Sequence, residues 1–318
     1  MIKKKKIVII GCGFIGFIYA KVLKKLNCEV VAIADPDSKR LKKTLQICSK
    51  NTQAYKNHLE LYKNVATSNY DIVAIAVTAN HHLKVIEKFS KIKKHIFCEK
   101  PFTNNYKEAR IAVKLCERNK VNLAVGFKMR YESVFQKLKA IIDSKKLGNI
   151  KYVSISYFQK KPYQKWAIKN GIHRESFVHP LDLLMWIFGK NMKIKSLEKN
   201  FSKKNGQKID AFLKLQNINF VISNRWLNKY ANFAGIGGST DLVLNAIGTK
   251  GQLVLIRPDF IKVFLDKKTI NYKLPKFNYD LPFYKEWKSF FNYINSNNPD
   301  HLVVNKSTLH FHKIIDKI

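Results

Sequence analysis

The stretch IVIIGCGFIG, residues 7–16, decides the fold, because an apolar β-branched run breaks directly into glycines and then into a helix-like segment. Gly11, Gly13 and Gly16 have the G-x-G-x-x-G spacing. In that pattern the first glycine makes a tight turn, the second lets a pyrophosphate approach the backbone, and the third lets helix and strand pack closely. The free N–H groups at the helix start then favour negative charge. A glycine-rich turn without a ligand is the alternative interpretation.

An acidic residue strengthens the nucleotide interpretation. Asp35 follows Gly16 by 19 residues, at the end of the next β-branched run. A carboxylate at that position accepts hydrogen bonds from the adenosine ribose and repels a 2′-phosphate. The sequence therefore predicts NAD as the cofactor, while Lys39 and Arg40 lie close enough to keep NADP open.

Strand-like and helix-like segments alternate over the first part of the chain. This rhythm predicts a doubly wound parallel sheet, a Rossmann fold with helices on both faces. The predicted strands are Lys6–Ile10, Val30–Ala34, Ile72–Val77, His95–Cys98 and Asn122–Gly126. The predicted helices between them are Phe14–Leu26, His82–Ser90 and Tyr106–Asn119.

The rhythm changes after about residue 148, where longer segments of alternating polarity predict an open, mainly antiparallel sheet in a C-terminal α/β domain. Residues 131–146 look like a helix joining the two parts. We therefore expect a dinucleotide-binding Rossmann domain at 1–125 and a domain for substrate binding and oligomerisation at 126–318. Two helices, Phe283–Asn295 and Lys306–Lys317, close the chain, and we expect the last of them to pack back on the first domain.

Composition excludes several classes of protein. The 318 residues are 46% hydrophobic and 25% charged, which is typical of a folded chain of about two domains. The formal charge of +37 suggests nucleic acid, but only 7 of the 59 basic residues are arginine, and the 52 lysines are scattered along the chain. Nucleic-acid binding is therefore only a minor alternative, and a positive field that attracts anionic small molecules is the milder consequence.

Cysteine usage and hydropathy bear on the compartment. The five cysteines are odd in number and include no C-x-x-C pair, so they indicate neither a disulfide framework nor a zinc module. No apolar run reaches the length of a membrane span, and the first residues do not look like a signal peptide. We expect a cytoplasmic protein.

Several motifs in a fixed order make the resemblance specific. The glycine motif and Asp35 are followed by Thr78-Ala79-Asn80-His81-His82, by Glu99-Lys100-Pro101 and by Gly126-Phe127-Lys128-Met129-Arg130-Tyr131. This order resembles the Gfo/Idh/MocA family of oxidoreductases over the whole first domain. The resemblance implies hydride transfer between a nicotinamide and a secondary alcohol or ketone of a sugar, cyclitol or nucleotide sugar. It also implies a homo-oligomer, a dimer or tetramer, with subunit contacts through the open sheet.

The resemblance assigns roles within the first domain. Lys100 matches the family's lysine that holds the substrate hydroxyl beside the nicotinamide, and a solvated lysine is the alternative interpretation. A lysine that lies beside the pyridinium ring and a second protein cation is suited to take part in a proton relay. The residues expected to bind the cofactor are Gly11, Gly13, Phe14, Ile15, Gly16, Asp35, Thr78, Asn80, His82, Glu99 and Lys100.

A second stretch, residues 171–182, resembles the family's D-x-x-x-H-x-x-D segment. His179 stands at the position of the catalytic histidine, and Asp182 follows it on the same helix face. Glu175 replaces the usual aspartate and is the third candidate catalytic residue, although a helix that starts at 176 or 177 leaves it outside that helix. Pro180 fits only the first helical turn.

The remaining candidates are less specific. Arg130 and Trp166 are expected near the substrate, together with Lys100, Asp182 and His179, and Tyr163 is a further neighbour. His81 and His82 lack a third ligand at useful spacing, so no metal is expected. His310 and His312 look like surface residues. The departure at Glu175 also leaves open a non-catalytic regulator that keeps the dinucleotide site.

Overall fold

The computed structural model describes residues 4–65, 69–201, 207–228, 240–299 and 301–318. The chain forms two compact units. Unit 1 comprises Met1–Lys128 and Tyr279–His312, and unit 2 comprises Met129–Asn278 and Lys313–Ile318. The grouping places the segment that starts at Tyr279 with the amino-terminal residues, although it lies late in the chain. The domain ranges inferred from the sequence stay a prediction.

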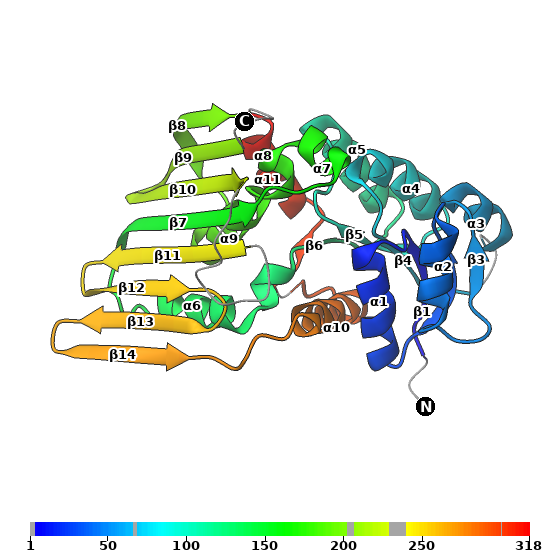
Figure 1. Cartoon of the computed structure of the whole chain (residues 1–318), viewed down its shortest axis with the longest axis horizontal. Coiled ribbons are helices and arrows are strands. Elements are labelled where there is room, and N and C mark those ends of the chain that lie inside the picture. The colour runs from blue at the N-terminus through cyan, green and yellow to red at the C-terminus, as the bar shows by residue number, and fades with distance from the viewer. Residues whose placement is uncertain (1–3, 66–68, 202–206, 229–239, 300) are drawn as a thin grey trace. The chain divides into compact units, whose positions relative to one another are not determined.

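A seven-stranded sheet forms the centre of unit 1 (Figure 1). Its strands are β1 (Lys6–Ile10), β2 (Glu29–Ala34), β3 (Gln53–Tyr55), β4 (Ile72–Ile75), β5 (His95–Glu99), β6 (Leu123–Gly126) and β15 (Val303–Val304). They lie in the order β15-β6-β5-β4-β1-β2-β3, and all neighbours are parallel except β15 and β6. The order 3-2-1-4-5-6 is that of doubly wound dinucleotide-binding sheets. The predicted Rossmann fold is therefore confirmed.

Helices cover this sheet because their apolar residues recur at three- and four-residue spacing. The helices are α1 (Phe14–Lys25), α2 (Ser38–Leu45), α3 (His58–Val65), α4 (Ala79–Lys91), α5 (Tyr106–Arg118), α10 (Asp280–Ser296) and α11 (Ser307–Ile315), the last crossing the division between the units. In α5 the buried residues are Ala109, Ala112, Val113 and Cys116. Asn105 caps that helix, accepting a hydrogen bond from the N–H of Glu108. Helix α4 packs against α3 and α5, and α1 packs against α10.

The late segment completes the core of unit 1. Trp287 of α10 is fully buried, and its ring stacks on Phe97 of β5 with the centroids 4.4 Å apart. Phe290 meets the same ring edge-on. The N–H of Phe127 donates to Glu286 Oε1 at 2.7 Å, which ties the end of β6 to α10. Unit 1 is therefore built from an early and a late segment of the chain.

An eight-stranded sheet forms the centre of unit 2 (Figure 1). Its strands are β7 (Ile150–Lys160), β8 (Lys193–Asn200), β9 (Gln207–Leu215), β10 (Ile218–Leu227), β11 (Thr240–Gly248), β12 (Gly251–Ile256), β13 (Phe260–Leu265) and β14 (Lys268–Lys273). They lie in the order β14-β13-β12-β11-β7-β10-β9-β8, and every neighbouring pair except β7 and β10 is antiparallel. This confirms the prediction of an open, mainly antiparallel sheet.

Short helices pack on the face of this sheet whose side chains are buried. They are α6 (Ser133–Asp143), α7 (Lys165–Asn170), α8 (Ile172–Glu175) and α9 (Val178–Phe188). A 3₁₀ turn, η1 (Lys128–Tyr131), precedes α6, so the helix predicted over 131–146 is shorter than expected. In β9 and β10 alternate residues are fully buried, whereas those between them are mostly half-buried. The sheet therefore keeps one face much more open than the other.

Candidate functional site

The glycine loop lies where the order of the unit 1 sheet reverses, between the carboxyl ends of β1 and β4. Gly11 has φ +95°, and a Cβ there would come within 2.5 Å of the carbonyl oxygen of Ala76. A Cβ on Gly16 would lie 1.8 Å from the carbonyl oxygen of Gly11. Gly13 is different, because no atom lies within 4 Å of its would-be Cβ. Two glycines are thus required by the fold, while Gly13 opens space above the loop.

Helix α1 starts in that open space. Its N-cap residue is Gly13, no side chain caps it, and its first turn contains no acidic residue. The N–H groups of a first helical turn have no partner within the helix. Phe14 and Ile15, predicted to contact the cofactor, are the first two residues of α1, and Phe14 is 69% exposed. The residues present therefore fit a dinucleotide pyrophosphate.

Asp35 follows β2 and is 4% exposed. Its Oδ2 accepts the N–H of Cys12 at 2.8 Å, and its Oδ1 accepts the N–H of Asp37 at 2.8 Å. The carboxylate is therefore fixed to the glycine loop itself. Arg40 pairs with Asp37 at 3.4 Å on the surface. The geometry favours the ribose hydroxyls of NAD, since each carboxylate oxygen keeps a further acceptor position.

The Thr78–His82 segment divides into exposed and buried parts. Asn80 is exposed at the start of α4, and its Oδ1 accepts the hydroxyl of Thr78 at 2.6 Å. His82 is fully buried, and its ring nitrogens lie 2.9 Å from the carbonyl oxygens of Val77 and Phe102. His82 thus ties the loop after β4 to the loop after β5 in this structure.

Lys100 follows β5, and Glu99 lies beneath it. Glu99 is 7% exposed, accepts the hydroxyl of Tyr19 at Oε1, and accepts the N–H of Lys100 at Oε2, 3.1 Å away. Burial raises the pKa of Glu99, while Tyr19, Lys100 and Lys128 act in the opposite direction. Lys100 itself is half-buried. Glu99 therefore anchors the backbone that carries Lys100.

Lys128 is a site neighbour that sequence reasoning missed. Its Nζ lies 4.3 Å from the ring centroid of Tyr279 and 5.3 Å from that of Phe283, and its charge acts on Glu99. The quoted motif contained Lys128, but only the packing of the late segment shows what the side chain contacts. Two lysines therefore influence one buried carboxyl group at the carboxyl edge of the sheet.

In unit 2 two predicted substrate residues bind each other. Arg130 Nε donates to Asp182 Oδ2 at 2.8 Å, and Nη2 donates to Oδ1 at 2.5 Å. Both are almost fully buried, at 8% and 3% exposure. Burial raises the pKa of Asp182, and Arg130 opposes that shift. In this structure the pair joins η1 to α9.

His179 lies in the first turn of α9 and is 9% exposed. Pro180 follows it within that turn, where proline fits. Glu175 is the last residue of α8, so it lies outside α9 as the sequence suggested, and its Oε1 accepts the side-chain amide of Asn170 at 2.8 Å. Glu175 and His179 therefore do not share a helix face.

Other predicted neighbours are at the surface or in the core. Tyr163 is 88% exposed and Trp166 is 48% exposed. The surface assignment of His312 is wrong, because its side chain is 2% exposed and its ring packs against Phe102. His310, two residues earlier, is half-buried. In an amphipathic helix those two positions face different sides.

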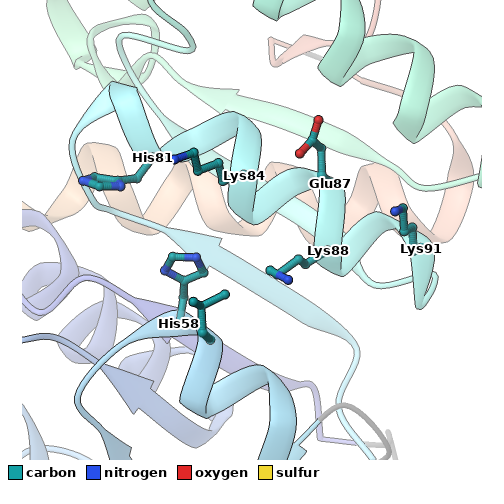
Figure 2. A pocket seen from close by; sticks show the side chains of 7 residues that line it. His58, His81, Lys84, Glu87, Lys88 and Lys91 are labelled. Carbon is teal, nitrogen blue, oxygen red and sulfur yellow. The ribbon is translucent and has the colours of Figure 1, made fainter.

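A surface cavity of about 430 Å³ lies between α3 and α4 (Figure 2). Its lining residues are His58, Leu59, His81, Lys84, Glu87, Lys88 and Lys91. Burial lowers the pKa of His58, as do His81, Lys88 and Lys84. His81 also belongs to the segment expected to bind the cofactor. The cavity therefore adds positive potential beside that segment, which attracts anions.

The described residues contain no group of three or more His, Cys, Asp or Glu side chains placed to hold a metal ion. Across the same parts of the chain, no helix has the length and apolar character needed to cross a bilayer.

Comparisons with known proteins place this geometry in context. Over 191 residues the chain is 28% identical to the myo-inositol 2-dehydrogenase of Thermotoga maritima, a match that covers 59% of this chain and 56% of that protein. It is 26% identical over 188 residues to the D-apiose dehydrogenase of Rhizobium rhizogenes, covering 57% and 53%. The matches thus span about half the length of these curated relatives.

Solved structures share the whole fold. An oxidoreductase from Agrobacterium radiobacter, in complex with NAD+, L-tartaric acid and magnesium, has a TM-score of 0.81 at 18% identity, covering 99% of this chain and 95% of that one. KijD10, a 3-ketoreductase from Actinomadura kijaniata in complex with NADP, has a TM-score of 0.81 at 15% identity, covering 99% and 97%.

Family models match both parts of the chain. Residues 5–127 match the NAD-binding Rossmann fold of the oxidoreductase family, and residues 135–254 match the C-terminal domain that accompanies it. The chain belongs to the Gfo/Idh/MocA family of oxidoreductases.

Proposed function

We propose that this protein is an NAD-dependent oxidoreductase that interconverts a secondary alcohol and a ketone on a sugar, cyclitol or nucleotide sugar. The open space at Gly13 carries the proposal, because it adjoins an uncapped helix start, and Asp35 is bonded to the same loop. The names of the relatives, which include inositol and apiose dehydrogenases, support this class of substrate. NADP is the alternative cofactor, as in the complex of KijD10.

The proposed roles divide between the units. When bound, the nicotinamide supplies the hydride donor or acceptor. Lys100 orients the substrate oxygen, and His179 takes up or returns its proton. Glu99 and His82 position the loops that carry the cofactor contacts, and Arg130 and Asp182 shape the substrate side of unit 2. Glu175, bonded to Asn170, has the least support as a catalytic group.

The experiment has two arms. Protein purified without added cofactor is denatured, and the released small molecules are identified by mass spectrometry, with a nicotinamide dinucleotide as the expected result. The native protein is then given NAD+ or NADP+ with a panel of cyclitols, sugars and nucleotide sugars, and NAD(P)H absorbance is followed. Calorimetry that shows no binding of any nicotinamide species would overturn the proposal. Binding of a nicotinamide dinucleotide without turnover of any compound in the panel would favour the alternative of a non-catalytic regulator.

We also propose a homo-oligomer that forms through the open face of the unit 2 sheet. Ile247 and Ile256 lie on that face and are 43% and 39% exposed. Light scattering is expected to give a mass above one chain, and Ile256→Lys should lower it. Ile111→Lys, which adds the same charge at a 37% exposed isoleucine of α5, should leave the mass unchanged. A monomeric wild type would contradict this proposal.

The five cysteines in the described residues are free thiols. Free thiols are usual in a reducing compartment. We therefore propose the cytoplasm as the site of action.

A further inference from the structure

A chain of hydrogen-bonded polar side chains in unit 2 leads to His179, and all of them except the half-buried Gln159 are buried. It starts at Asn224 of β10, which is fully buried, passes through Ser176 just before α9, and reaches Gln159 and Tyr157 of β7. Such groups are costly to bury, so a connected set of them needs an explanation.

The hydrogen bonds of this chain run in one direction. Asn224 Nδ2 donates to Ser176 Oγ at 2.9 Å, Ser176 Oγ donates to Gln159 Oε1, and Gln159 Nε2 donates to the Tyr157 hydroxyl oxygen at 2.9 Å. Asn224 Nδ2 also donates to the carbonyl oxygen of Tyr157 at 2.5 Å. The amide at position 224 donates to both acceptors, whereas a carboxylate there would have no proton to give. The direction of the whole chain therefore depends on Asn224.

Two contacts connect this hydrogen-bonded chain to His179. The N–H of His179 donates to the carbonyl oxygen of Ser176 at 3.0 Å, so Ser176 sets where α9 begins. The ring of Tyr157 lies edge-on to the imidazole, with centroids 6.1 Å apart and planes at 87°. Ser176 and Tyr157, which both contact the histidine, are thus held by the same chain.

We propose that Asn224 and Ser176 are positioning residues, which fix the imidazole of His179 by clamping the start of α9 and the ring of Tyr157 to β7 and β10. The effect of this positioning on catalysis rests on the proposed function. The effect on the position of the imidazole does not. A displacement of a reacting group by about 1 Å lowers a rate by up to about 100-fold. Asn224→Asp is the sharpest change, since it keeps the shape and removes both donated hydrogen bonds.

The first readout is independent of activity. NMR spectra of histidine-labelled protein are recorded for wild type, Asn224→Asp and Ser176→Ala, and His179→Ala assigns the His179 signal by its loss. We expect both changes to shift the His179 ring resonances and Ser176→Thr, which keeps the hydroxyl, to restore them. Asn271→Asp on the exposed edge strand β14 is the matched control and should leave them in place. An unmoved His179 signal in folded Asn224→Asp and Ser176→Ala protein would overturn the proposal.

The second readout is a double-mutant cycle on kcat with a substrate found in the panel. Asn224→Asp is expected to lower kcat by about 10- to 100-fold with little change in KM. In a His179→Ala background the same change should have almost no further effect, because coupled residues are not additive. Equal losses in both backgrounds would overturn a role through His179. If His179→Ala keeps full kcat while the NMR shift is present, the positioning stands and the proposed catalytic role of His179 fails.

Discussion

Replacing Gly13 with valine is expected to weaken dinucleotide binding about 100-fold while leaving the folded protein nearly as stable as before. The would-be Cβ of Gly13 points into open space, with no protein atom beyond its chain neighbours within 4 Å, so the new side chain extends into the place proposed for the pyrophosphate. A steric conflict of about 3 kcal/mol corresponds to a loss of affinity of about 100-fold. Calorimetry with NAD+ measures the affinity, and thermal unfolding measures the stability, which should change by about 1 kcal/mol or less.

Gly16→Ala supplies the contrast, since its new methyl group would lie 1.8 Å from the carbonyl oxygen of Gly11. This variant is expected to lose about 2 kcal/mol of stability or more. If folded Gly13→Val protein keeps the NAD+ affinity of the wild type, the proposed placement of the pyrophosphate beside Gly13 is wrong.

Lys100→Met is expected to lower kcat by about 10²- to 10⁴-fold, which is the usual contribution of a group that handles a proton in the transition state. Methionine keeps most of the apolar stem and removes the ammonium group. Dinucleotide affinity should stay close to that of the wild type, because the glycine loop, α1 and Asp35 are untouched. Steady-state kinetics with the best substrate of the panel, together with calorimetry, separates the two effects.

The matched control is Lys94→Met. Lys94 precedes β5 as Lys100 follows it, and its Nζ donates to the carbonyl oxygen of Tyr70 at 2.8 Å. Ligands of parallel sheets bind at the carboxyl ends of strands, so the control variant should keep its kcat. A loss at Lys100 no greater than that at Lys94 would remove the lysine from the mechanism.

The parts of the fold that local physics dictates could be predicted from the sequence. The glycine spacing reflects backbone crowding within one turn, and β1 was predicted with its observed bounds because its residues are almost all buried. The position of Asp35 beside the glycine loop could be predicted from its distance along the chain, because the end of β2 must lie next to that loop. The alternation of strands and helices gave the topology by the same reasoning.

The parts that depend on distant residues could not be predicted. Arg130 and Asp182 were each assigned to the substrate, which stays a prediction, whereas their hydrogen bond across 52 residues could not be predicted. The cofactor contact expected for His82 stays a prediction, whereas its hydrogen bond to the backbone of the loop after β5 could not be predicted. The surface assignment of His312 failed because its neighbour Phe102 lies more than 200 positions earlier. Helical spacing does not reveal which face another segment covers.

The return of α10 to the amino-terminal sheet has a consequence for biosynthesis. Phe97 emerges from the ribosome long before Trp287, the residue that stacks on it. Until α10 has been translated, nascent chains carry an aromatic surface that chaperones and proteases recognise. A polypeptide that is truncated before α10 should therefore be degraded in the cell. It should not persist as a free-standing nucleotide-binding fragment.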